Sequence, residues 1–223
     1  MTQAGTTHRE ITVKYANGSL KEKKSTQEGK LAGEYTSYFQ NGQIMARIHY
    51  SAGRKNGEAV TYYANGQIRE QSQFLNDRLH GQYVSYYENG HIREEEHYKK
   101  GKLDGTYRRY FKTGELREEE QFKNGKFHGE YVCYFKSGQI KEKGAFVADK
   151  REGDYVAYYK SGRIREKALY KNDKPVGKFL SFHEDGGAAD GEIMEDADAS
   201  RVWDEKDVAD LLSDLSHFEK KQK

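Results

Sequence analysis

The stretch Gly33–Tyr50, GEYTSYFQNGQIMARIHY, decides the fold because it contains the glycines, the aromatic residues and the turn that recur along the chain. Two short runs rich in aromatic and β-branched residues flank Asn41-Gly42. An Asn-Gly pair between such runs is the strongest short-range signal for a β-hairpin, and it suits a type I′ turn, in which both central residues have positive φ. The stretch therefore predicts one hairpin with a two-residue turn.

The same stretch recurs every 24 residues without an insertion. Two or three glycines in each unit disfavour a helix. The pattern therefore predicts an all-β repeat, a long antiparallel sheet of consecutive hairpins over residues 11–183 that follows an N-terminal tail over 1–10. One column of glycines consists of Gly33, Gly57, Gly81, Gly105, Gly129, Gly153 and Gly177.

The composition explains what such a sheet must pack. Leu, Ile, Val and Phe make up about 17% of the 223 residues, below the roughly 20% at which a core becomes hard to build. The chain nevertheless contains 18 tyrosines and one proline, whereas disordered chains are usually poor in aromatic residues and rich in proline. These numbers exclude an ordinary aliphatic core and indicate a protein that packs tyrosine.

A two-residue turn in the quoted stretch fixes which residues share a face of the sheet, because directly opposed residues point the same way. It places Tyr35, Phe39, Ile44 and Tyr50 on one aromatic face, where Gly33 leaves room beside Tyr50.

The opposite face is predicted to carry cross-strand pairs of a tyrosine and a base, each contributing about 0.5–1 kcal/mol. This face is either simply solvated or a track for an acidic partner, anionic lipid or nucleic acid, and the acidic residues interleaved in the body argue against nucleic acid. The candidate binding residues are the pairs Tyr62–Arg69, Tyr86–Arg93, Tyr110–Arg117, Tyr134–Lys141 and Tyr158–Arg165. A second basic column occupies the connections, at Lys30, Arg54, Arg78, Lys102, Lys126, Lys150 and Lys174.

No arrangement of residues suggests catalysis. Metal-ligand spacings, P-loops and dinucleotide fingerprints are absent from the sequence, so we expect no cofactor, no metal and no enzyme. A column of glutamates is expected to be structural and to bond tyrosine hydroxyls or nearby bases. It comprises Glu22, Glu70, Glu94, Glu118, Glu142 and Glu166.

The C-terminal part differs in charge from the rest. Residues 184–223 hold 13 acidic and 5 basic side chains, so they are strongly negative while the preceding body is positive. We expect an acidic flexible linker over 184–202 and an amphipathic helix over 203–220 that either caps the sheet or docks into a partner's groove. The acidic tail is also expected to fold back on the basic face. The helical stripe consists of Trp203, Val208, Leu211, Leu212, Leu215 and Phe218.

The N-terminus has no apolar signal region, and no run approaches the length of a membrane helix. We therefore expect a cytoplasmic protein, peripheral to the membrane if the basic columns bind lipid.

The repeated core, as in Gly129-Glu-Tyr-Val-Cys-Tyr-Phe-Lys-Ser-Gly138, resembles that of MORN repeat proteins, and most closely their bacterial-type variant. The resemblance covers residues 11–183 and implies an elongated, single-layer antiparallel sheet of hairpins. It also implies scaffolding and protein interaction, with phospholipid binding in some members and an antitoxin label on related bacterial proteins.

Together these observations predict a non-enzymatic scaffold that uses the sheet surface and a C-terminal docking helix to hold a protein partner. Peripheral binding to anionic membrane lipids is one alternative, and neutralisation of a partner toxin is another. Both sheet ends and one face are available for a homo-oligomer.

Overall fold

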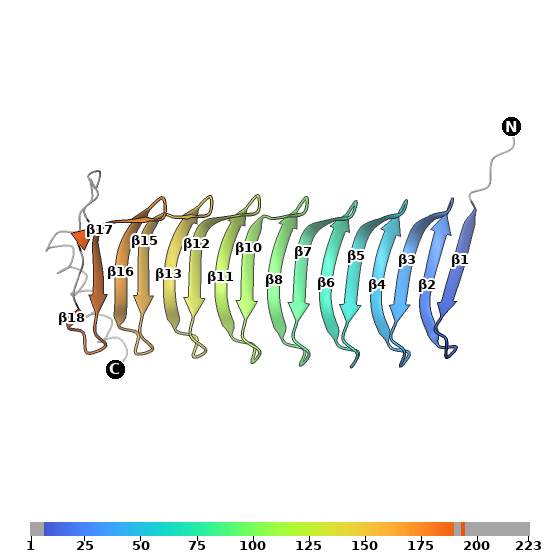
Figure 1. The fold of residues 1–223 in the computed structure, drawn as a ribbon, viewed down its shortest axis with the longest axis horizontal. Coiled ribbons are helices and arrows are strands. Elements are labelled where there is room, and N and C mark those ends of the chain that lie inside the picture. Colours follow the sequence, from blue (N-terminus) through green and yellow to red (C-terminus); the bar gives the residue numbers. More distant parts are fainter. Residues whose placement is uncertain (1–6, 190–192, 195–223) are drawn as a thin grey trace, which may run out of the picture. The chain divides into compact units, whose positions relative to one another are not determined.

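A computed structural model describes residues 7–189 and 193–194, and all their regular structure is β-strand (Figure 1). The all-β prediction is confirmed, whereas the helix predicted over 203–220 lies outside the described residues. The strands are β1 (His8–Lys14), β2 (Leu20–Gln27), β3 (Lys30–Tyr38), β4 (Ile44–Ser51), β5 (Arg54–Tyr62), β6 (Ile68–Leu75), β7 (Arg78–Tyr86), β8 (Ile92–Lys99), β9 (Lys102–Leu103), β10 (Gly105–Tyr110), β11 (Leu116–Lys123), β12 (Lys126–Tyr134), β13 (Ile140–Val147), β14 (Lys150–Arg151), β15 (Gly153–Tyr158), β16 (Ile164–Lys171), β17 (Lys174–Phe182), β18 (Ala188–Ala189) and β19 (Ile193–Met194).

The chain divides into two compact units. The first contains Met1–His128 with Lys136–Gly138, and the second contains Gly129–Phe135 with Gln139–Lys223. Within each unit, strands that follow one another in the chain pair antiparallel in an open sheet. Strand β1 starts within the segment predicted as an N-terminal tail, and β18 and β19 lie within the segment predicted as a linker.

The turn at Asn41-Gly42 is not the predicted two-residue type I′ turn. The Phe39 N–H donates to the Gln43 carbonyl (2.8 Å) and the Gly42 N–H donates to the Phe39 carbonyl (2.9 Å), which makes the loop three residues long. Only Gly42, with φ of 85°, has positive φ in this loop, as expected for a type I turn followed by a left-handed glycine. The residue before the glycine needs no special φ, so Thr113, Ser137 and Ser161 serve in later turns.

The type I′ turns lie instead in the connections, at the other ends of the strands. Ser51 pairs with Arg54 across a two-residue turn in which Ala52 and Gly53 have φ of 50° and 83°. The base that follows each of these turns belongs to the second basic column.

The predicted register holds through the middle of the hairpin and fails near its turn. Tyr35 pairs with Ile48 and Gly33 with Tyr50, as expected, but Tyr38 rather than Phe39 lies opposite Ile44. A β-bulge between Ser37 and Tyr38 gives β4 one extra residue, which compensates for the longer turn.

The aromatic face, defined by the Tyr35 and Tyr50 columns, supplies most of the packing. Its rings meet edge to face, as between Tyr35 and Tyr50, with centroids 6.1 Å apart and planes at 77°. Such pairs contribute about 0.5–1.5 kcal/mol beyond their buried area. The same contact recurs at Tyr83–Tyr98, Tyr107–Phe122 and Tyr155–Tyr170, and a more tilted one at Tyr131–Phe146.

Gly33 has a different role from the one predicted. A Cβ built on Gly33 would meet no atom within 4 Å, so the residue is not needed to leave room beside Tyr50. Its φ is 83°, which a side chain strains, and it lies where the β2–β3 register shifts. The glycine therefore permits a bulge inside the strand.

Candidate interaction surfaces

The face opposite the aromatic face, here called the groove face, has a polar central column. In the first unit, four cross-strand pairs lie at the strand centres. The central column consists of the second residue of each pair. The pairs are Thr36–Arg47, Val60–Gln71, Val84–Glu95 and Arg108–Glu119.

Two of the predicted tyrosines are tied to this column. The Tyr86 hydroxyl donates to Gln71 Oε1 (2.7 Å), and the Tyr110 hydroxyl donates to Glu95 Oε2 (2.6 Å). Burial, followed by the bond to Glu95, raises the pKa of Tyr110 to about 12. Both hydroxyls therefore remain neutral donors that join one hairpin to the preceding one.

The predicted tyrosine–base pairs are not formed, because the bulge changes their register. Tyr62 lies opposite Ile68 rather than Arg69. The equivalent partners in the other hairpins are Tyr86–Ile92, Tyr110–Leu116, Tyr134–Ile140 and Tyr158–Ile164. Lys141, the remaining predicted base, is exposed in β13.

Most of these bases instead contact a carboxylate or another ring. Arg69 is 3.5 Å from Glu70, and Arg117 lies over the ring of Phe111 at 5.9 Å. Arg93–Glu94 (3.3 Å) and Arg165–Glu166 (3.1 Å) repeat the ion pair. Ion pairs this exposed stabilise the fold by about 0–1 kcal/mol each. Their main effect is to neutralise part of the positive charge of these bases.

The glutamate column has the structural role expected of it. Arg109 lies 3.3 Å from Glu94 and 2.9 Å from Glu118, and the Tyr155 hydroxyl donates to Glu142 (3.1 Å). Among residues 7–189 and 193–194, no three His, Cys, Asp or Glu side chains are placed to hold a metal ion.

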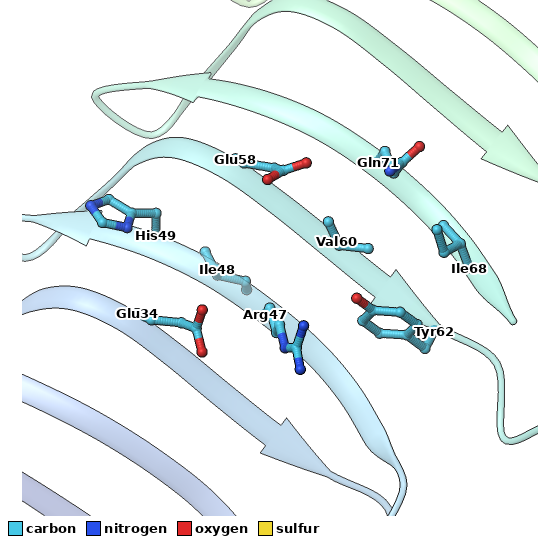
Figure 2. Close-up of a pocket in the computed structure, with 9 residues that line it drawn as sticks. All are labelled: Glu34, Arg47, Ile48, His49, Glu58, Val60, Tyr62, Ile68 and Gln71. Carbon is cyan, nitrogen blue, oxygen red and sulfur yellow. The ribbon is translucent and has the colours of Figure 1, made fainter. Parts of the chain in front are cut away.

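A groove of about 390 Å³ opens on the groove face across β3 to β6 (Figure 2). Its lining includes Val60, which is only 8% exposed, and Ile68, which is half-buried and offers more apolar surface. The lining residues are Glu34, Arg47, Ile48, His49, Glu58, Val60, Tyr62, Ile68 and Gln71.

At the groove the central column holds a base, Arg47, in place of the acceptor groups of the next three repeats. Bases also occupy this column at Lys23, Lys143 and Lys167. Tyr86 and Tyr110 find an acceptor 15 residues earlier, but the residue at that place for Tyr62 is Arg47, a donor. Within the described residues, the Tyr62 hydroxyl, the Arg47 guanidinium and the Glu58 carboxylate have no hydrogen-bonding or ionic partner. Three polar groups therefore line the groove without a partner in the described part of the chain, and Arg47 and Glu58 are exposed to solvent.

A second concave surface lies at the type I′ turns of the first unit. It has a volume of about 370 Å³ and contains no carboxylate among its lining residues, which are Arg54, Leu75, Asn76, Arg78, His80 and Lys100. Leu75 is 47% exposed there. We call this surface the basic pocket.

Sequence reasoning found Tyr62, Arg54 and Arg78 but missed Arg47, Glu58, His49 and Lys100. The sequence does not single out Arg47, because the column aligned at 24 residues holds bases at four positions, Lys23, Arg47, Lys143 and Lys167. No pattern in the sequence predicts that Arg54, Arg78 and Lys100 lie close together at the basic pocket, because their proximity depends on how the turns of neighbouring hairpins stack.

These features define an open-sheet repeat protein, in which hairpins that follow one another within a unit pack together. The chain belongs to the MORN repeat variant family, whose model matches six consecutive repeats at residues 31–52, 55–76, 79–100, 103–124, 127–148 and 151–172. MORN repeats are commonly protein- or membrane-interaction modules. The described residues include no helix that could cross a membrane.

No curated protein matches the chain. Among solved structures, it is similar to a GtfA/B complex bound to UDP and GlcNAc, with 13% identity over 52% of this chain and 22% of the other, and a TM-score of 0.23. A TcdB2-TccC3-Cdc42 structure shares 11% identity over 87% and 10% of the two chains, with a TM-score of 0.26. A Bacteroides fragilis protein of unknown function shares 10% identity over 76% and 97%, with a TM-score of 0.14. The chain thus spans less than a quarter of the first two.

Proposed function

We propose that this protein is a non-enzymatic, cytoplasmic scaffold that holds a protein partner in the groove over β3 to β6. The observation that carries the proposal is the group of polar side chains there that have no partner among the described residues, Arg47, Glu58 and Tyr62. In the next two repeats, the equivalent tyrosines Tyr86 and Tyr110 are bonded internally.

The groove specifies the chemistry of its partner. Arg47 and Tyr62 are donors, so they call for a carboxylate or carbonyl acceptor, while Glu58 calls for a donor. The apolar surface of Ile68, which is half-buried in the groove lining, favours an aliphatic side chain between these polar contacts. A protein segment offers all three kinds of group at once, which a lipid headgroup does not.

Affinity capture from the native source with mass spectrometry tests the proposal. We expect a partner set bound by the wild type to be lost from the double variant Arg47→Gln, Tyr62→Phe, while circular dichroism is unchanged. Arg69→Gln, an exposed base of the same unit outside the groove, is the matched control and should retain the partners. Identical partner sets for all three proteins would reject the groove as the binding site.

The predicted helix over 203–220 adds a second proposed contact. A chain ending at Met194 retains every described strand, so its comparison with the full chain isolates the tail. We expect the truncated chain to lose part of the partner set. If its partners match those of the full chain, the tail is not a docking element.

Binding to anionic lipid is the second candidate, and the basic pocket is the observation that favours it. Basic residues near an anionic surface contribute about 1 kcal/mol each. We expect sedimentation with phosphatidylserine vesicles at low salt, its loss at high salt, and its loss in the triple variant Arg54→Gln, Arg78→Gln, Lys100→Gln. Failure to sediment at low salt would exclude this candidate. No contact in the structure favours the antitoxin alternative.

A further inference from the structure

The outer edge of β1 presents unpaired backbone groups. On its inner side β1 pairs with β2, from His8 opposite Gln27 to Val13 opposite Glu22, and the Glu28 N–H donates to the Thr7 carbonyl (3.2 Å). Hydrogen-bonded pairs alternate along an antiparallel ladder. Odd-numbered residues of β1 therefore direct their backbone groups toward β2, and even-numbered ones direct theirs outward. No described residue pairs with this outer edge.

The last long strand, in the second unit, is different. The outer side of β17 pairs with β18, Phe182 opposite Ala188, and with β19, Lys178 opposite Ile193. Such cover is the usual protection of a terminal strand. Strand β1 has seven residues, no proline and a register shift only at its end, between Val13 and Lys14, so its edge can accept another strand.

We infer that the β1 edge binds the β1 edge of a second copy of this chain, antiparallel and centred on Thr12. This register places Glu10 opposite Lys14 of the second copy twice, and Ile11 opposite Val13 twice. Glu10, Thr12 and Lys14 are exposed on one face, and Ile11 and Val13 are half-buried on the other. The edge is thus complementary to itself in charge and in polarity.

Other registers with the same backbone alignment lack this complementarity. Centring on Ile11 places Glu10 opposite Thr12 and Arg9 opposite Val13, which forms no ion pair. Centring on Glu10 places two carboxylates directly opposite each other, which is destabilising. Charge therefore selects the register centred on Thr12.

The aromatic face continues across this contact. Ile11 pairs with Lys24, which pairs with Tyr35, so Ile11 belongs to the aromatic face. The Ile11–Val13 contacts extend that face into the second copy. Because the two copies use the same edge around a two-fold axis, the assembly closes at two and forms no fibre through this contact. The inference does not depend on the groove.

Light scattering on the full-length protein over a range of concentrations tests whether a dimer forms, and charge reversal tests its register. Glu10→Lys alone and Lys14→Glu alone should each weaken dimerisation about tenfold or more, because both create like-charge pairs. The double variant Glu10→Lys, Lys14→Glu exchanges the charges and should restore it. A monomer at every concentration, or single variants that dimerise like the wild type, would overturn the inference.

Cysteine crosslinking provides an independent test in a Cys133→Ser background. Thr12→Cys places two thiols opposite each other in a hydrogen-bonded pair, with Cα atoms about 5.5 Å apart, which a disulfide can span. It should therefore crosslink under mild oxidation. Ile11→Cys, whose partner is Val13, is the matched control and should not crosslink. Equal crosslinking of both variants would contradict the proposed register.

Discussion

At the residue scale, a further aromatic column joins neighbouring repeats through its hydroxyl groups. This column includes Phe39, Tyr63, Tyr87 and Phe111, which are 24 residues apart. The Tyr63 hydroxyl donates to the Tyr86 carbonyl (2.7 Å), and the Tyr87 hydroxyl donates to the Tyr110 carbonyl (2.8 Å). The equivalent position in an earlier repeat is Phe39, which has the ring but no donor. The ring is thus the constant requirement of this column, and the hydroxyl adds an optional link between repeats.

We predict that Tyr87→Phe lowers the free energy of unfolding by about 1 kcal/mol, the usual net contribution of one hydrogen bond. Urea denaturation followed by circular dichroism measures it. The converse variant, Phe39→Tyr, should gain up to about 1 kcal/mol by donating to the carbonyl of Tyr62. Both variants unfolding at the wild-type midpoint would show that these links do not contribute to stability.

A second residue-scale effect concerns Glu120 on the aromatic face. Burial first, and repulsion from Glu118 second, raise the pKa of Glu120 to about 7 although Arg109 opposes the shift. The folded state thus holds this proton more tightly than the unfolded state, whose pKa is about 4.5. The contribution of Glu120 to stability is therefore most favourable at low pH and declines as pH rises from about 4.5 to about 7.

Glu120→Gln removes this titration while keeping the shape of the side chain. We expect the variant to match the wild type at pH 4 and to exceed its free energy of unfolding at pH 8 by about 1–2 kcal/mol, allowing for solvent screening. Glu88→Gln, at an exposed turn, is the control and should change neither value. Parallel pH profiles for Glu120→Gln and the wild type would mean that Glu120 ionises normally.

At the scale of the element, each repeat uses two different turns, one at each end of its strands. The three-residue turn needs one left-handed residue, and a glycine supplies it. The two-residue turn needs two left-handed residues. One of them is Ala52, which adopts φ of 50° although it has no polar side chain to stabilise this conformation. Asparagine and glycine tolerate this conformation better than alanine does.

Ala52→Gly should therefore stabilise the protein, by about 0.5–1 kcal/mol, because it relieves the left-handed strain at Ala52. The control is Ala64→Gly in a three-residue turn, where φ is not positive and added flexibility should slightly destabilise. Thermal unfolding distinguishes the two variants, because the melting temperature should rise for Ala52→Gly and fall slightly for Ala64→Gly. Destabilisation by Ala52→Gly would show that the turn is not strained.

At the scale of the whole molecule, a repeat array is stabilised by nearest neighbours, so what matters is how its terminal strands are covered. Strands β18 and β19 are only two residues each, yet they pair with the outer side of β17. Their main effect is to occupy backbone groups that would otherwise accept a foreign strand.

Two truncations test this role. A chain ending at Met194 retains the cover on β17 and should behave in solution like the full chain, apart from contacts made by the tail. A chain ending at His183 loses β18 and β19 and should form larger assemblies at high concentration, detected by light scattering. Equal size distributions for the two truncations would show that β17 needs no cover.

The sequence determined the all-β repeat, the 24-residue phase and the aromatic face, because alternation and turn residues are local properties that recur seven times. Within the hairpin it also determined that Tyr35 faces Ile48. It could not determine the turn type at Gly42, since Asn-Gly suits more than one turn and the choice depends on a bulge between Ser37 and Tyr38. The equivalent bulge in the next hairpin, between Thr61 and Tyr62, places Tyr62 opposite Ile68 instead of Arg69.

Only the tertiary structure decided which polar groups have no partner among the described residues. Whether the Tyr62 hydroxyl has a partner depends on a residue of the preceding hairpin, Arg47, and whether Arg54 and Lys100 converge depends on the stacking of turns. The outer sides of β1 and β17 also differ, because β18 and β19 pair with the outer side of β17. Local preference fixes a repeat, whereas contacts between repeats decide which of its surfaces stay open.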